Sequence, residues 1–139
     1  MRFRPWLLCL AAVPLLAACV DDSASYQNES KDQSLTLIRQ QRWLWDKTVD
    51  AAVVVSRLPD CQRRHNLEPL PPQARVELWQ PGSGTFVIRR GDNNAMILTE
   101  TQTCEGWQNL PAEPPGGLGR QLGTFDPQDG KLRFVPAGK

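Results

Sequence analysis

Few residues in this chain of 139 have side chains that could carry out catalysis or bind a metal. The sequence contains one histidine, His65, and Cys61 lies four residues before it. A Ser-His-Asp or Cys-His catalytic arrangement would need His65, and Cys61 is the nearest nucleophile. Cys61, His65 and Cys104 could also bind a metal, but a fourth ligand and the usual CxxC or HxxxH spacing are missing. We therefore predict no catalytic site, no metal site and no cofactor.

Residues 1–19 have the layout of a bacterial export signal. Arg2 and Arg4 make the start positively charged, and residues 6–18 are apolar. At about 1.5 Å rise per residue, this stretch is shorter than the ~20 residues that span a bilayer as a helix. It ends in Leu16-Ala17-Ala18-Cys19. This run resembles the lipobox of bacterial lipoproteins, where a signal peptidase cuts before a cysteine that carries lipid.

The resemblance implies that residues 1–18 are a lipoprotein signal peptide and that Cys19 becomes the acylated first residue of the mature chain. The same segment also fits an ordinary secretory signal cut after Ala18, which would leave Cys19 as a free thiol. In lipoproteins of enterobacterial type, Asp directly after the acylated cysteine favours retention at the inner membrane. Val20 occupies that position here. The resemblance therefore implies a lipid anchor in the outer membrane, with the protein facing the periplasm.

The four cysteines then divide by position. Cys9 leaves with the signal and Cys19 takes the lipid, so Cys61 and Cys104 remain in the folded part. Because the periplasm is oxidising, we expect these two to form a disulfide. Closing a loop of about 44 residues would stabilise the fold by roughly 4 kcal/mol in the chain-entropy model.

The charge of the mature chain bears on its partners. Two of the 16 basic residues leave with the signal, so 14 remain against 15 acidic ones. This balance gives no electrostatic reason for nucleic-acid binding. Five cationic side chains could still form a small face for an anionic partner such as lipopolysaccharide phosphate or a cell-wall carboxylate. They are Arg63, Arg64, His65, Arg89 and Arg90. The alternative is scattered surface charge that nearby acidic residues neutralise.

The residues after the predicted cut are polar and have few apolar side chains. We therefore predict that residues 19–33 are a lipidated N-terminus and flexible tether, with an r.m.s. reach of about 20 Å. The folded domain is then expected at residues 34–136. Within it, residues 34–47 carry both helical and alternating patterns. They favour a short helix followed by a strand, with a strand alone as the alternative.

Strand patterns dominate the rest of the chain. Residues 49–58 are apolar on both faces, as expected for a central strand. Residues 60–73 contain three prolines, and we predict a long loop there that is a candidate for function. Further strands with hairpin turns or a Pro/Gly connector between them are predicted at 75–80, 85–90, 95–103, 119–125 and 131–135.

These patterns predict a mainly β fold. We expect one small domain, an antiparallel sheet, sandwich or partly open barrel of five to six strands, with one short N-terminal helix allowed. The function that fits best is a non-enzymatic, lipid-anchored accessory of the envelope that binds a protein, lipopolysaccharide or the cell wall. The alternative is an inhibitor of a hydrolase such as lysozyme, because small disulfide-bonded β-barrel lipoproteins of that kind have a similar layout. A periplasmic enzyme is the third and weakest hypothesis.

Overall fold

The computed structural model describes residues 19–138, which form ten β-strands and no helix. The strands are β1 (Asp21–Gln27), β2 (Gln33–Gln40), β3 (Val49–Arg57), β4 (Cys61–Leu70), β5 (Val76–Gly82), β6 (Thr85–Arg90), β7 (Met96–Glu100), β8 (Trp107–Leu110), β9 (Arg120–Gln128) and β10 (Lys131–Pro136). No helix within residues 19–138 is long and apolar enough to cross a membrane. The predicted signal peptide at residues 1–18 lies outside the described residues.

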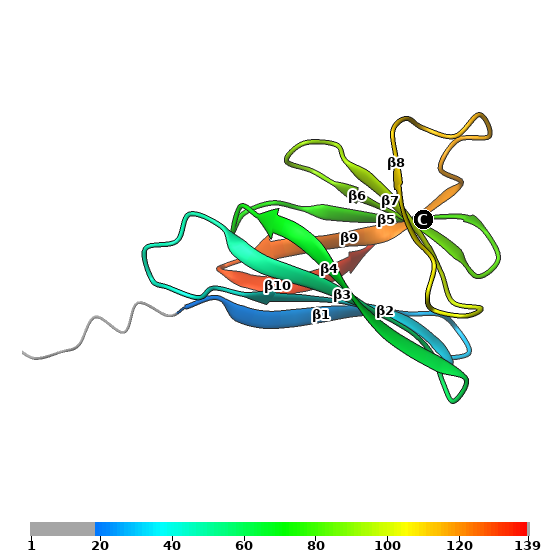
Figure 1. Ribbon diagram of the computed structural model, residues 1–139, viewed down its shortest axis with the longest axis horizontal. Coiled ribbons are helices and arrows are strands. Elements are labelled where there is room, and N and C mark those ends of the chain that lie inside the picture. The colour runs from blue at the N-terminus through cyan, green and yellow to red at the C-terminus, as the bar shows by residue number, and fades with distance from the viewer. Residues whose placement is uncertain (1–18, 139) are drawn as a thin grey trace, which may run out of the picture.

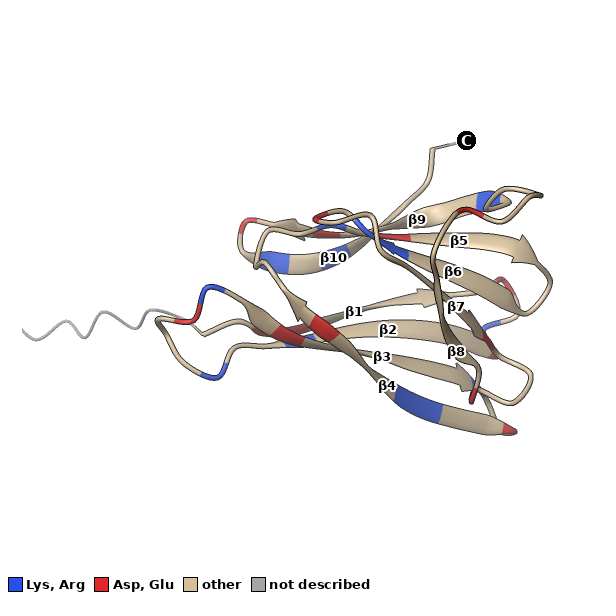
Figure 2. Cartoon of the chain, turned by 45° about the horizontal axis from the view of Figure 1, so that its top comes forward, with Lys and Arg blue, Asp and Glu red and all other residues tan. Residues whose placement is uncertain are grey.

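The strands form two antiparallel sheets that face each other as layers (Figures 1 and 2). The four-stranded sheet has the order β1-β2-β3-β4, and the six-stranded sheet has the order β10-β9-β5-β6-β7-β8. The sheets are not closed into a barrel. This confirms the prediction of a small, mainly β, antiparallel domain and shows it to be a sandwich, but the predicted number of strands is too low.

The core lies between the two sheets. The four-stranded sheet contributes alternate residues of its inner strands, such as Leu35, Leu37, Val53 and Val55. The facing sheet contributes a matching set that includes Val76, Leu78, Phe86, Ile88 and Phe125. Side chains that alternate in and out along each strand are expected for two packed sheets.

The predicted tether at residues 19–33 is wrong, because Asp21–Gln27 forms the edge strand β1 and pairs with β2 along its whole length. Its outward residues are exposed and polar. Its inward residues are half-buried, and of these Ala24 and Tyr26 pack against the core while Asp22 is charged. Only the inward face of β1 is covered by the domain, and one of its three inward residues is the charged Asp22. The segment therefore has too few apolar residues to be recognised as a strand from its composition. The folded domain therefore begins next to Cys19.

The expected helix in residues 34–47 is also absent. Leu35, Leu37 and Arg39 point to the same buried face of β2. Burial therefore repeats every two residues, as in a β-strand, and not with the period of a helix. Residues 41–48 then form a loop without strand structure. Trp43 and Trp45 lie in this loop and are exposed.

The predicted loop at residues 60–73 is mostly the edge strand β4. Only Leu67 and Leu70 are buried in this strand, and most of its other side chains are exposed. Pro69 is tolerated because an edge strand does not need every backbone N–H for pairing. Near it, the register between β3 and β4 shifts at Val49/Ala51. Polarity at a sheet edge was thus misread as a loop.

The remaining strand predictions are confirmed. The central strand is β3, the meander is β5-β6-β7, and the last hairpin is β9-β10. Asp129 and Gly130 form the two-residue turn of that hairpin, with φ angles of 53° and 76°. Positive φ at both positions is what a tight hairpin turn of this kind requires, and Asp-Gly is a preferred pair there.

Candidate functional site

The thiol of Cys19 lies at the start of the folded domain. Cys19 is exposed and is the one cysteine among residues 19–138 that is not in a disulfide. Val20 next to it is held by two hydrogen bonds, because the Gln41 N–H donates to the Val20 carbonyl over 2.7 Å and the Val20 N–H donates to Gln41 Oε1 over 3.2 Å. A group attached to the Cys19 sulfur would therefore be held close to the domain.

A buried ion pair fixes β1 to the rest of the sandwich. Arg39 is only 1% exposed, and its Nε and Nη2 donate to the two oxygens of the Asp22 carboxylate over 2.9 and 2.7 Å. Arg39 Nη1 donates to the Pro72 carbonyl, and the Leu132 N–H at the start of β10 donates to Asp22 Oδ2 over 2.9 Å. Three residues of extended chain span about 10 Å at most, so this pair holds Cys19 near the core.

The environment of Asp22 acts on its pKa in two directions. Burial raises the pKa of its carboxyl, but the hydrogen bonds from Arg39 and from the Leu132 N–H, with the positive charge of Arg39, outweigh burial. The net effect lowers the pKa of Asp22 below its usual value. The carboxylate therefore stays charged and can balance the buried guanidinium.

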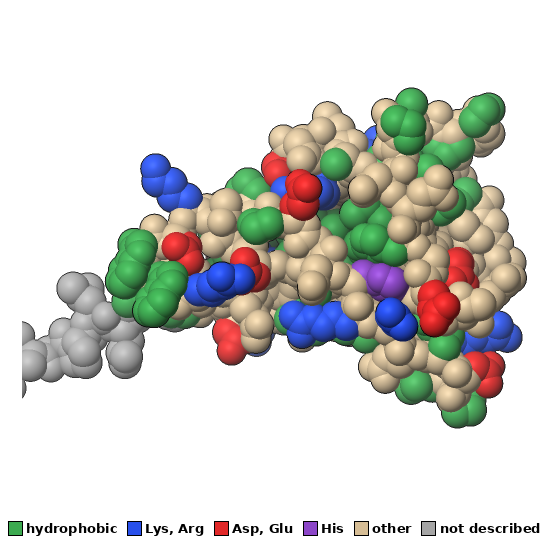
Figure 3. Space-filling model, viewed as in Figure 1, with side chains coloured by type: hydrophobic (Ala, Val, Ile, Leu, Met, Phe, Trp, Pro, Cys, Tyr) green, Lys and Arg blue, Asp and Glu red, His purple; other side chains and the backbone are tan. Residues whose placement is uncertain are grey.

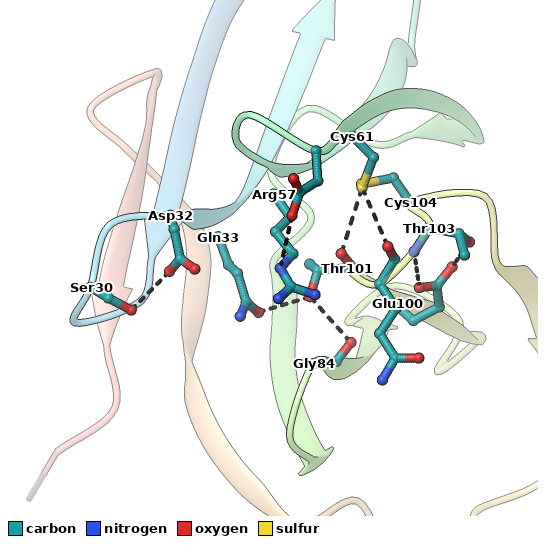
Figure 4. Close-up of polar contacts among 12 residues, drawn as sticks. Ser30, Asp32, Gln33, Arg57, Cys61, Gly84, Glu100, Thr101, Thr103 and Cys104 are labelled. Atoms are coloured by element: carbon teal, nitrogen blue, oxygen red, sulfur yellow. Dashed lines mark hydrogen bonds and ion pairs between the residues drawn. A yellow bond between two sulfur atoms is a disulfide. The ribbon is translucent and has the colours of Figure 1, made fainter.

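The predicted disulfide between Cys61 and Cys104 is confirmed, with a Cα–Cα distance of 5.9 Å (Figure 4). Cys61 begins β4 in one sheet, and Cys104 lies in the turn between β7 and β8 of the other. The disulfide therefore ties the two sheets together at one side of the sandwich. In the same region Thr101 Oγ1 donates to Gln33 Oε1 over 2.8 Å, which adds a second contact between the sheets.

His65 belongs to this junction as well. Its Nε2 lies 2.7 Å from the Cys104 carbonyl and donates to it, and its ring stacks on Trp107 with centroids 4.6 Å apart and planes 3° apart. The two cysteines are oxidised, so the alternative metal site of Cys61, His65 and Cys104 has no thiolates to offer. The histidine that a catalytic arrangement would have needed instead links β4 to β8.

The five candidate anion-binding residues do not form one cationic face. Arg90 is buried, and its guanidinium donates to both oxygens of Asp92 and to the carbonyls of Glu68 and Pro69. The hydrogen bonds from Arg90 lower the pKa of Asp92 and outweigh the opposing effect of burial. Arg90 therefore connects β6 to the end of β4 and does not face solvent.

The other arginines differ in their exposure and in their ion-pair partners. Arg89 contacts Glu77 and lies over the ring of Trp79, with 5.5 Å from its Cζ to the centroid. Arg63 on β4 is exposed, and its Nη1 lies 3.6 Å from Glu105. Arg64 is exposed on the same strand and lines a shallow hollow of about 370 Å³ with Arg42. Arg63 and Arg64 thus remain exposed on β4, but as consecutive residues of one strand they point to opposite sides of the sheet and do not form one face.

Glu100 organises the turn that carries Cys104, a role that its sequence context did not reveal. Its carboxylate accepts hydrogen bonds from the Thr103 N–H (2.8 Å) and the Thr103 hydroxyl (2.6 Å) (Figure 4). It also accepts one from the Gly106 N–H (2.9 Å). Burial raises the pKa of Glu100, but these hydrogen bonds dominate and lower it to about 2. A Cβ on Gly106 would lie 2.8 Å from Glu100 Cγ, so only glycine allows this approach.

Glu100→Gln is expected to lower the free energy of unfolding by about 2 kcal/mol at pH 7, because an ionised acceptor of several hydrogen bonds is replaced by an amide. The lowered pKa means that the carboxylate stabilises the fold above pH 4.5 and that this stabilisation is lost as the pH falls towards about 2. Urea unfolding of parent and variant should therefore differ most at neutral pH and converge in acid. Glu105→Gln, at an exposed neighbour, should show no such difference at any pH.

Comparison with known proteins gives no relative for this chain. No family model, no curated protein and no solved structure matches it. The interpretation of its function therefore depends on its own residues and geometry.

Proposed function

We propose that this protein is a bacterial lipoprotein, acylated on Cys19, anchored in the outer membrane and facing the periplasm, where it works by binding as a non-enzymatic envelope accessory. The observation that carries the proposal is the exposed thiol of Cys19 at the start of the domain, directly after the lipobox-like run. A diacylglyceryl group and an N-acyl chain would give essentially permanent membrane attachment, since each buried methylene contributes about 0.8 kcal/mol.

The rest of the domain supports a structural or binding role. Cys61, Cys104 and His65 are used in the junction between the sheets, and Arg39 and Arg90 are buried in ion pairs. The side chains that could carry chemistry thus hold the sandwich together. The exposed polar surface of β4, including Arg63 and Arg64, remains available to a partner in the periplasm.

The alternative of a lysozyme inhibitor rested on a similar β-barrel layout. The two sheets here are not closed into a barrel, so this similarity no longer favours an inhibitor. It remains an outcome that the experiment below can detect.

Cys19→Ser is expected to remove the protein from the outer membrane, because the serine hydroxyl cannot take the thioether-linked lipid. The measurement is fractionation of inner and outer membranes from cells that express the full chain, followed by immunoblotting. Cys9→Ser is the matched control, since Cys9 precedes the cut and its loss should leave the location unchanged. A Cys19→Ser protein that stays in the outer-membrane fraction would contradict the lipid anchor.

Crosslinking of the same outer-membrane fractions tests the binding role. The parent protein should be recovered with a resident envelope protein, lipopolysaccharide or a cell-wall fragment. Recovery of no partner, together with inhibition of added lysozyme, would instead support the inhibitor.

A further inference from the structure

Three consecutive large apolar side chains are exposed in the loop of residues 41–48. Trp43, Leu44 and Trp45 are 57%, 54% and 74% exposed. The two indole rings stack on each other, with centroids 5.4 Å apart and planes 10° apart. Figure 3 shows hydrophobic side chains gathered at the end of the molecule where the described chain begins. A continuous exposed apolar run is unfavourable in water unless something covers it.

The loop is held in this exposed shape by its own hydrogen bonds. The Asp46 N–H donates to the Trp43 carbonyl over 3.1 Å, and the Trp43 N–H donates to Asp46 Oδ2 over 3.2 Å. Gln41 Nε2 donates to the Asp46 carbonyl over 2.9 Å. These contacts close the base of the loop and leave the apolar side chains pointing away from the core.

The same loop lies beside the residue that carries the proposed lipid. Gln41 joins the two, because its Oε1 accepts from the Val20 N–H while its Nε2 donates to the Asp46 carbonyl. Cys19 and Arg42 line one shallow hollow with the start of β1. Figure 1 places the start of β1 and the β2–β3 loop at the same end of the long axis.

We propose that the loop of residues 42–47 is a second membrane contact that inserts into the headgroup region of the leaflet holding the acyl chains of Cys19. This inference rests on the proposed acylation, which places a bilayer within reach of the loop. Tryptophan combines a large apolar ring with an N–H donor and is favoured at membrane interfaces. Arg42 and Lys47 flank the apolar run. Lys47 is exposed and can reach lipid phosphates, whereas Arg42 is paired with the Asp50 carboxylate.

The second contact would set the orientation of the domain. A lipid on Cys19 alone leaves the sandwich free to tilt about one point, whereas two contacts at one end restrain that tilt. The long axis then points into the periplasm, and the Cys61–Cys104 junction and the polar face of β4 stay accessible. Bilayer lipid is favoured over a second copy of the chain as the partner, because the acylated residue and the loop share one end of the domain.

Quenching of tryptophan fluorescence by brominated lipid tests this proposal. The mature acylated protein is reconstituted into phosphatidylethanolamine–phosphatidylglycerol vesicles that contain lipids brominated either near the headgroup end or deep in the acyl chain. We expect quenching that is strongest for the shallow bromine position. Trp43→Ser with Trp45→Ser should abolish it, and both positions are exposed, so the fold should be retained. Trp79→Phe, in β5 of the other sheet, is the matched control and should leave the quenching unchanged.

The outcomes separate this inference from the proposed function. Acylated protein whose Trp43 and Trp45 are not quenched would overturn the membrane contact and leave the lipid anchor intact. A blue shift that grows with protein density in the vesicles, without quenching, would assign the loop to a second copy and also overturn it. Protein that carries no acyl mass would overturn the proposed function and this inference with it.

Discussion

Asp22→Ala is expected to lower the free energy of unfolding by about 3–5 kcal/mol, the cost of leaving a buried charge without its partner. Arg39 is 1% exposed, and among residues 19–138 no other carboxylate contacts it. The Leu132 N–H would also lose its acceptor, so β1, β2 and β10 would all be affected. Urea unfolding of the non-acylated Cys19→Ser form of the mature chain, followed by far-UV circular dichroism, measures the change.

Two further variants define what this result means. Asp50→Ala removes an exposed ion pair with Arg42, whose side chains are 43% and 74% exposed, and should cost at most about 1 kcal/mol. Asp22→Ala combined with Arg39→Met should recover much of the lost stability, because no charge is then left buried. If Asp22→Ala cost no more than Asp50→Ala, β1 would behave as the flexible tether that composition suggests.

The second large effect is expected at the disulfide. Replacing both Cys61 and Cys104 with Ala should lower the free energy of unfolding by about 4 kcal/mol, since a bond between residues separated by 43 positions restricts the unfolded chain strongly. This loss is a large share of the 5–15 kcal/mol that is typical of a native protein. Urea unfolding of parent and double variant gives the difference.

The exposed cysteine supplies the control for this prediction. Cys19→Ser should leave the unfolding midpoint unchanged, because Cys19 is exposed and outside any disulfide. The denaturant slope should also be recorded, since removal of a disulfide makes the unfolded state less compact. A double variant as stable as the parent would show that the contacts of Thr101 and His65 hold the two sheets together without the bond.

Strands with clear turns and buried alternation could be predicted from the sequence. The meander β5-β6-β7 and the hairpin β9-β10 have regular apolar positions and turn residues such as Asp129-Gly130. The disulfide followed from the lipobox and the parity of the remaining cysteines. In each case the pattern that can be recognised in the sequence, whether alternation, turn residues or paired cysteines, involves the same residues that the tertiary structure uses.

The two edge strands of the smaller sheet could not be predicted in this way. β1 and β4 bury few apolar side chains, and their stability comes from distant partners: Arg39 for Asp22, and Cys104 and Trp107 for Cys61 and His65. A single sequence contains no signal for such pairings. One clue was present in β2, where Arg39 follows Leu35 and Leu37 at a spacing of two and so had to be buried with a partner.

The candidate site was predicted in part. The Cys61–Cys104 disulfide is confirmed, and the acylation of Cys19 stays a prediction. The cationic set was chosen by closeness in sequence. The fold separates that set, because Arg90 turns inward to the end of β4 and Arg89 is engaged by Glu77. The exposure of Trp43 and Trp45 could not be predicted, since tryptophans in a small domain more often fill its core.

In the proposed function, the folded domain is attached directly to the membrane through acylated Cys19. Intact-mass analysis of protein purified from native membranes, alkylated without prior reduction, tests this most directly. We expect the mass of residues 19–139 plus a diacylglyceryl group and one further acyl chain, with no alkylated thiol. A mature chain without acyl mass, or one whose Cys61 and Cys104 react with the alkylating reagent before reduction, would contradict it.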